Sequence, residues 1–367
     1  MDILNEVLDK FNFKGENKEI KTFGSGHINT TYLATYENNG EELKYVIQKI
    51  NSNVFKNIDG LMDNIFKVTP HLRKKIKEAG GDENRETLHF INTKDGKNYY
   101  TDENGDYYRA YVFVPESISY DKADNANLLF ESGMAFGRFQ RLLADFSASS
   151  LHETLPDFHN TQKRFETEFT PAVTNDVASR KAECEKEIEF VSSREEYCSR
   201  VVNLIEENKI PLRVTHNDTK LNNVLFDENS NKAICVIDLD TVMPGTALYD
   251  FGDAIRFGTN FAEEDEKDTS KVGINLDYFK AYAEGFLSEA GKSLNQTEID
   301  NLAFASLLMT FECGMRFLTD YLNGDTYFKT AYSDHNLVRA RNQFALVADM
   351  EKHMDEMNEI IKNIRID

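Results

Sequence analysis

The stretch VTHNDTKLNNVLFD, residues 214–227, indicates the fold and the chemistry of this chain more clearly than any other. Asp218 and Asn223 lie there in the pattern H-x-D-x-x-x-x-N, directly before a run of strand-forming residues. A turn and a second strand-like run follow, and that run ends in ICVIDLD, which contributes Asp238 and Asp240. Because a hairpin brings its two ends together, these acids and the amide are predicted to meet in one place.

Acids and an amide in this arrangement suit phosphoryl transfer, which depends on positioning and charge neutralisation more than on covalent chemistry. Asp218 is predicted to be the catalytic base that takes or orients the proton of an attacking hydroxyl. Lys220 follows it closely and is predicted to contact the transferring phosphate. Asn223 and Asp238 are predicted to bind Mg²⁺ through oxygen atoms. Asp240 is compatible with two roles, as a further metal ligand or as a partner of a backbone group.

Residues 1–114 combine strands with one helix. The glycine turn in FGSGHINTTYLATY leads into a strand, and Gly24 and Gly26 are predicted to cover the phosphates of a nucleotide with backbone N–H groups. The strand YVIQKI follows. Since side chains alternate along a strand, Gln48 and Lys49 point to opposite faces and only one can reach the phosphates. Charge favours Lys49.

Helical periodicity then covers residues 57–79, and further strands lead to Phe113 and Val114, which are also expected to bind the nucleotide. After Pro115 the pattern is helical apart from the hairpin of the opening stretch. The predicted fold class is α+β: a two-lobed, protein-kinase-like fold with a small, mostly-β N-terminal lobe and a large helical C-terminal lobe. The predicted domains are a nucleotide-binding lobe, 1–114, and a helical lobe with the catalytic residues, 115–367.

Composition narrows the classes of partner. The 367 residues carry 42 basic and 63 acidic side chains, a net charge of −21, which disfavours nucleic acid as a partner. The four cysteines lack the spacing of zinc sites. The N-terminus does not resemble a signal peptide, and no apolar run suggests a membrane helix, so a cytoplasmic location is expected. The oligomeric state is not indicated.

Several segments resemble a known family. THNDTKLNNVLFD and VIDLDTVMPGTALYDFGDAIRFG resemble the aminoglycoside phosphotransferase superfamily. GHINTTYL, NLLFESGMAFGRFQ and TFECGMRFLTDYLNGDTYFKT are similar to bacterial N-acetylhexosamine 1-kinases, over about residues 20–345. The resemblance implies that ATP, with Mg²⁺, phosphorylates the anomeric hydroxyl of N-acetylglucosamine or N-acetylgalactosamine. It also implies that Arg316 and Tyr327 contact the sugar.

Two other functions are weighed against this one. A kinase of another small alcohol, of the aminoglycoside, choline or homoserine type, would share the motifs of the superfamily. The basic residue Arg316 in the acceptor segment suits a neutral or anionic acceptor better than a polycation. A nucleotide-binding pseudokinase regulator would be expected to lack the base or a metal ligand, whereas Asp218, Asn223 and Asp238 are all present.

Overall fold

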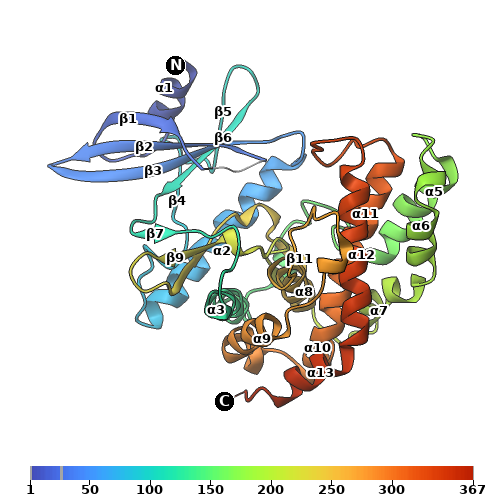
Figure 1. The fold of residues 1–367 in the computed structure, drawn as a ribbon. Helices are drawn as coiled ribbons and strands as arrows, with labels where there is room; N and C mark the ends of the chain where they lie inside the picture. The colour runs from blue at the N-terminus through green and yellow to red at the C-terminus, as the bar shows by residue number, and fades with distance from the viewer. Residues whose placement is uncertain (1, 25–27, 367) are drawn as a thin grey trace. The chain divides into compact units, whose positions relative to one another are not determined.

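The structure is a computed structural model that describes residues 2–24 and 28–366, and it confirms the α+β class (Figure 1). The chain packs into two compact units, each made of separate segments. Unit 1 comprises Met1–Ile118, Ser147–Leu155 and Leu225–Pro244, and unit 2 comprises Ser119–Phe146, Pro156–Val224 and Gly245–Asp367. The expected lobes, 1–114 and 115–367, stay a prediction about functional organisation.

Unit 1 is built on an antiparallel six-stranded sheet in the order β1-β2-β3-β6-β4, with β5 pairing to β6 (Figure 1). Its strands are β1 (Glu16–Thr22), β2 (Thr30–Asn38), β3 (Glu41–Ile50), β4 (Phe90–Ile91), β5 (Tyr100–Thr101) and β6 (Tyr107–Val112). The strands predicted from the sequence are therefore present, although β4 and β5 are much shorter than their hydrophobic runs suggest.

The two faces of this sheet have different surroundings. On one face, Val7 of helix α1 (Asp2–Lys10) and Phe11, directly after the helix, pack in an apolar cluster that includes Ile47 of β3 and Ala110 of β6. The opposite face carries the alternate residues of the same strands. Strand register thus separates neighbours in sequence onto two faces with different chemistry.

Unit 1 also contains the helix predicted over residues 57–79, which is α2 (Ile58–Glu78). Its first turn is capped by the side chain of Asn57, which accepts the N–H of Gly60. The predicted hairpin forms β9 (Val224–Asp227) and β10 (Ala233–Val236), and β7 (Ser117–Ile118) pairs with β9. Strand β11 (Met243–Gly245) follows in the chain.

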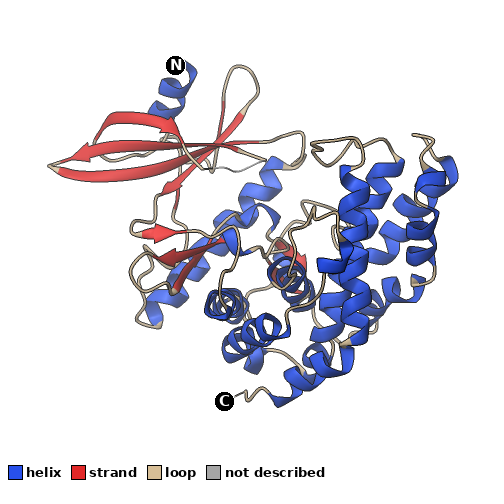
Figure 2. Ribbon diagram, viewed as in Figure 1, coloured by secondary structure: helices blue, strands red, loops and turns tan. Residues whose placement is uncertain are grey.

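Unit 2 is mainly helical, as Figure 2 shows by colour. Its longer helices are α3 (Ala126–Leu142), α6 (Glu185–Ser192), α7 (Glu195–Glu206), α8 (Ala247–Gly258), α9 (Leu276–Ala290), α11 (Leu302–Leu322), α12 (His335–Lys352) and α13 (Met354–Asn363). Shorter elements are α4 (Thr161–Arg164), a π-helical turn (Phe165–Phe169), α5 (Thr170–Asn175), β8 (Arg213–Thr215) and α10 (Gln296–Asp300). Glycines allow α3 and α9 to approach closely, because a Cβ at Gly133 or Gly285 would clash with a backbone carbonyl of the other helix.

One helical segment differs from the sequence-based expectation. The run from residue 180 to residue 207 reads as a single helix, but the structure divides it into α6 and α7. The hydroxyls of Ser192 and Ser193 donate to the carbonyls of Ile188 and Phe190, and these local bonds compete with continuation of the helix.

Helix α11 is apolar and long. Among the described residues it is the one helix that could cross a membrane by length and composition, and 94% of its most apolar window is buried inside the protein. Core helices of soluble proteins share these properties, so this feature is weak evidence for a membrane span.

Candidate active site

The loop that carries Asp218 is held by acidic side chains of helix α8. Asp250 accepts the backbone N–H groups of His216, at 3.0 Å, and of Asn217, at 2.7 Å. Asp253 accepts the N–H of Thr219 at 2.9 Å. Both acids are buried, and hydrogen bonds from the loop satisfy oxygen atoms that water cannot reach. The loop is therefore fixed by the helix rather than by local turn chemistry alone.

The structure brings the predicted base together with two of its predicted neighbours. The Nζ of Lys220 lies 2.8 Å from Oδ1 of Asp218. The Nδ2 of Asn223 donates to the backbone oxygen of Asp218, at 2.8 Å, and to its Oδ2, at 3.2 Å. The amide nitrogen of Asn223 is thus used inside the loop, which leaves its Oδ1 as the atom suited to a cation. Asp218, Lys220 and Asn223 form one polar cluster in unit 2.

A second layer of charge surrounds this cluster. Arg256 donates to Oδ1 of Asp253, at 3.1 and 3.0 Å, and pairs with Glu264 at 2.9 Å. Burial alone would raise the pKa of Asp253, but the positive charges of Arg256 and Lys220 outweigh it and lower that pKa. Asp253 therefore stays ionised while it holds the loop.

The segment with Asp238 and Asp240 lies in unit 1. Asp238 has φ 58 and ψ 61, a left-handed conformation that is uncommon for a residue other than glycine. Asp240 is buried and forms an ion pair with Arg109 of β6. Its Oδ2 also accepts a hydrogen bond of 2.6 Å from Asn29. Both partners of Asp240 are side chains rather than backbone groups, and its predicted role as a metal ligand stays a prediction.

Strand β3 places Lys49 and Gln48 on opposite faces, as the alternation requires. Lys49 lies on the face covered by α1, and its Nζ pairs with Asp106 at 2.5 Å. Gln48 lies on the other face, where its Oε1 accepts the Nε–H of Arg109 at 2.9 Å. Gln48 therefore lies on the same face as Arg109, the partner of Asp240, and the assignment of Lys49 to the phosphates stays a prediction.

For the other residues that are predicted to bind the nucleotide, the structure gives few contacts that bear on this role. Gly24 has φ +76, and a Cβ there would meet open space, so its conformation rather than crowding favours glycine. Gly26 lies outside the described residues. The ring of Phe113 contacts the ring of Phe23 edge-on, with centroids 5.8 Å apart, and Val114 is buried. These assignments stay predictions.

The two residues expected at the acceptor lie together in unit 2. The guanidinium of Arg316, in α11, lies 5.8 Å from the ring centroid of Tyr327 and 5.3 Å from that of Phe158. Tyr327 is 65% exposed, so its ring is available to a ligand. Glu312 precedes Arg316 on the same helix and is bonded to His159, at 2.8 Å, and to Thr161, at 2.6 Å.

Sequence reasoning missed Asp250, Asp253, Glu312, His159 and Arg109. A partial signal was present for the first three, because each is an acid inside an apolar helical run, in ALYDFGDAIRFG or TFECGMRFL. A buried acid needs a partner, which makes such positions candidates for an anchoring role. The partners themselves lie far away in the chain and carry no local pattern.

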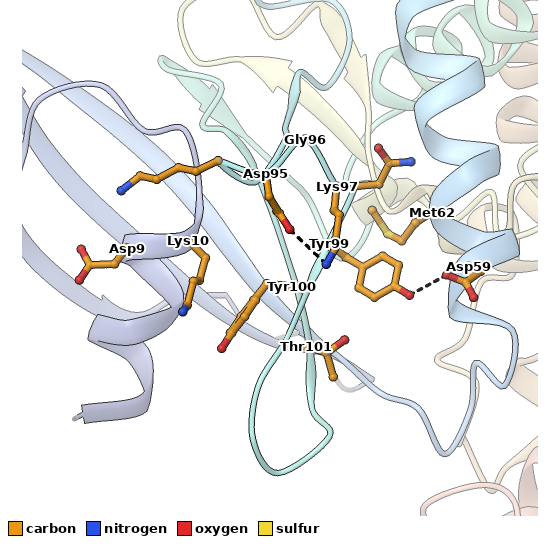
Figure 3. A pocket seen from close by; sticks show the side chains of 12 residues that line it. Asp9, Lys10, Asp59, Met62, Asp95, Gly96, Lys97, Tyr99, Tyr100 and Thr101 are labelled. Atoms are coloured by element: carbon orange, nitrogen blue, oxygen red, sulfur yellow. Dashed lines mark hydrogen bonds and ion pairs between the residues drawn. The ribbon is translucent and has the colours of Figure 1, made fainter.

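Two cavities lie in different units of the protein. Figure 3 shows a cavity of about 750 Å³ in unit 1, between α1, α2 and the segment Lys94–Thr101, where Tyr99 donates to Asp59. It contains none of the predicted site residues. A smaller cavity of about 200 Å³ in unit 2 is lined by Leu221, which follows Asp218 and Lys220 in the chain, and by Arg256. Arg316 and Tyr327 do not line it.

Comparison with solved structures shows a kinase-like fold. Spectinomycin phosphotransferase in complex with ADP and spectinomycin has a TM-score of 0.57 at 12% identity, covering 96% of this chain and 98% of that one. An aminoglycoside phosphotransferase from Alicyclobacillus acidocaldarius has a TM-score of 0.58 at 11% identity, covering 98% and 96%. Choline kinase from Cryptosporidium parvum has a TM-score of 0.52 at 15% identity, covering 94% and 92%.

These likenesses, at 11–15% identity, show the kinase-like fold. The profile of the Phosphotransferase enzyme family matches residues 19–283, and the chain belongs to that family.

Proposed function

We propose that this protein is an ATP-dependent kinase that phosphorylates the anomeric hydroxyl of N-acetylhexosamines, giving a sugar 1-phosphate and ADP. The observation that carries the kinase chemistry is the cluster of Asp218, Lys220 and Asn223, held by Asp250 and Asp253. A fixed carboxylate beside a fixed ammonium offers both a proton acceptor and a phosphate contact, which are the parts that phosphoryl transfer requires.

In this proposal Asp218 orients the sugar hydroxyl and receives its proton as the oxygen attacks the γ-phosphorus of ATP. Lys220 leaves its ion pair with Asp218 to contact the γ-phosphoryl oxygens. The bond from the γ-phosphorus to the bridging oxygen breaks, and ADP leaves with that oxygen. Gly24, Gly26, Phe113 and Val114 are assigned to nucleotide binding.

Asn223 and Asp238 would hold Mg²⁺. The donor set fits this ion: one carboxylate and one amide oxygen are hard ligands, and Mg²⁺ commonly binds through few protein oxygens together with phosphates and water. The use of Asn223 Nδ2 by Asp218 leaves the correct amide atom for this purpose. When bound, the ion would neutralise charge on the phosphates.

The surroundings of Arg316 support a neutral acceptor. Glu312 is a buried acid four residues before Arg316 in the helix, and its oxygens already accept from His159 and Thr161. It is therefore not a spare counter-ion for a cationic substrate such as choline or an aminoglycoside. Arg316 offers a planar set of donors for ring hydroxyls or an acetamido oxygen, and the exposed Tyr327 offers a ring face.

The test is a side-by-side measurement of ADP release with N-acetylglucosamine, N-acetylgalactosamine, choline, ethanolamine and kanamycin. We expect turnover with the hexosamines, and phosphorus NMR should identify a 1-phosphate. A 6-phosphate would refute the proposed regiochemistry. Turnover with choline or kanamycin alone would assign the chain to the other small-alcohol kinases of its family.

A further inference from the structure

Arg109 is a charged side chain in the interior of unit 1. It is 1% exposed, and its guanidinium lies 5.8 Å from the ring centroid of Phe90. The guanidinium pairs with Asp240, and its Nε donates to Gln48 at 2.9 Å. A buried charge is tolerated only when it is paired and hydrogen-bonded. The segment that carries Asp240 is therefore tied to the sheet through this guanidinium.

Asp240 is occupied on both carboxylate oxygens. One oxygen pairs with Arg109, and the other accepts the 2.6 Å hydrogen bond from Asn29. Asn29 is itself fixed, because its Oδ1 accepts the backbone N–H of Asn51 at 2.9 Å. A carboxylate that is 4% exposed, with one oxygen in an ion pair and the other in a hydrogen bond, is suited to anchoring a backbone segment.

Asp238 is the residue that this anchor would position. It precedes the short 3₁₀ turn Leu239–Thr241 and adopts the left-handed conformation. Such a conformation persists at a non-glycine residue only when the surrounding structure holds it. The ion pair and the hydrogen bond of Asp240, two residues further on in this turn, contribute to that hold.

We propose that Arg109 is a positioning residue for Asp238. In this proposal Asp240 is not a metal ligand but the residue through which Arg109 holds the turn that follows Asp238. The proposal rests on the role of Asp238 in the proposed function. The proposal also explains why β3 carries Gln48 beside Arg109. Arg109 of β6 supplies the positive charge on this face of the sheet, and Gln48 orients its guanidinium through a hydrogen bond. A lysine at position 48 would bring a like charge towards Arg109.

The test measures metal binding without any sugar. Mn²⁺ replaces Mg²⁺ because its binding can be followed by electron paramagnetic resonance in the presence of ADP, and metal-free ADP binding is measured by calorimetry. Loss of a residue that orients a metal ligand commonly weakens metal binding by about 10–100-fold. We expect Arg109→Met to weaken Mn²⁺ binding by that factor while metal-free ADP binding is unchanged, and Arg109→Lys to recover part of the loss.

The opposite assignment predicts a different result. If Asp240 were a metal ligand, Arg109→Met would release its carboxylate, and Mn²⁺ binding would stay the same or become tighter. Either outcome would overturn the proposal. Because no sugar is present, a wrong acceptor in the proposed function would not affect these measurements.

Two further variants distinguish a specific effect on metal binding from a general loss of stability. Arg109→Met/Asp240→Asn leaves no unpaired buried charge, so it is expected to fold and to bind Mn²⁺ as Arg109→Met does. A clear additional loss on adding Asp240→Asn would show a direct metal role for Asp240 and refute the anchor. The matched control is Arg85→Met/Asp227→Asn, which removes another ion pair of unit 1, of 3.1 Å, and should leave Mn²⁺ binding unchanged. An equal loss there would attribute the effect to general destabilisation.

Discussion

The ammonium of Lys220 lies 2.8 Å from the carboxylate of Asp218, in a loop whose backbone is fixed by Asp250 and Asp253. Burial opposes the charge on Lys220, but Asp218 outweighs it and raises the pKa of the ammonium. Because the pKa of Lys220 is raised in the folded protein, its ion pair stabilises the fold at pH values below the ordinary pKa of 10.5. This stabilisation is lost only as the pH rises through the pKa of the folded state. Lys220 is therefore charged at neutral pH.

Lys220→Met should lower kcat strongly, because it removes a fixed positive charge from the transferring phosphate. Removing one such electrostatic contact typically costs about 10²–10³-fold in kcat. Steady-state kinetics with N-acetylglucosamine will measure the loss. Lys122→Met is the control, since Lys122 pairs with Glu263 on the surface of unit 2. Equal rates in the two variants would exclude a role for Lys220 in the chemical step.

Asp218→Asn keeps the size of the side chain and removes its ability to accept a proton. General-base contributions are about 10²–10⁴-fold, and we expect turnover to fall by that factor. Nucleotide affinity, measured by calorimetry with ADP, should stay nearly constant. A variant that retains more than about a tenth of the wild-type turnover would remove Asp218 from this role.

Lys49→Met distinguishes the sequence-based assignment from the observed orientation. Since Lys49 lies on the sheet face that α1 covers and pairs with Asp106, we expect the KM for ATP to stay constant and stability to fall by about 0–1 kcal/mol, as for a partly exposed ion pair. Asp106→Asn breaks the same pair and is the matched control. If Lys49→Met raised the KM for ATP and Asp106→Asn did not, Lys49 would contact the phosphates as first predicted.

Arg316→Ala should weaken sugar binding without affecting ATP. An unpaired polar group costs about 1–3 kcal/mol, which corresponds to a rise of roughly one to two decades in the KM for the sugar. The control is Arg341→Ala, which removes a surface arginine of unit 2 that pairs with Glu187 at 2.7 Å. A lower melting temperature with an unchanged KM for the sugar would make Arg316 a structural residue.

Glu312 should make stability depend on pH in the acid range. Burial alone would raise its pKa, but His159, Arg164 and Arg316 lower it below the usual 4.5. A depressed carboxyl pKa adds stability above the unfolded value, and this is lost as pH falls through the folded value. The free energy of unfolding, measured with urea, should therefore decrease less below pH 4.5 in Glu312→Gln than in the wild type. The exposed Glu168→Gln is the control, and an unchanged acid limb in Glu312→Gln would contradict the prediction.

The local parts of the fold followed from the sequence. Helix α2, strand β3 and the β9–β10 hairpin lie where periodicity and turn residues predicted them, because these signals act over a few neighbouring residues. Asp218 and Asn223, which the motif assigned to one site, are in contact within one short loop. The alternation in β3 predicted that Gln48 and Lys49 face opposite sides.

Which of those two residues faces Asp240 was decided only by the tertiary structure. Alternation defines two faces of a strand but not what covers them, and only the structure shows that α1 covers the face on which Lys49 lies. Asp250 anchors a loop more than thirty residues earlier in the chain, and Asp240 finds its partner on β6. Such pairs leave no periodic pattern, because the requirement that a buried charge be paired acts through space and not along the chain.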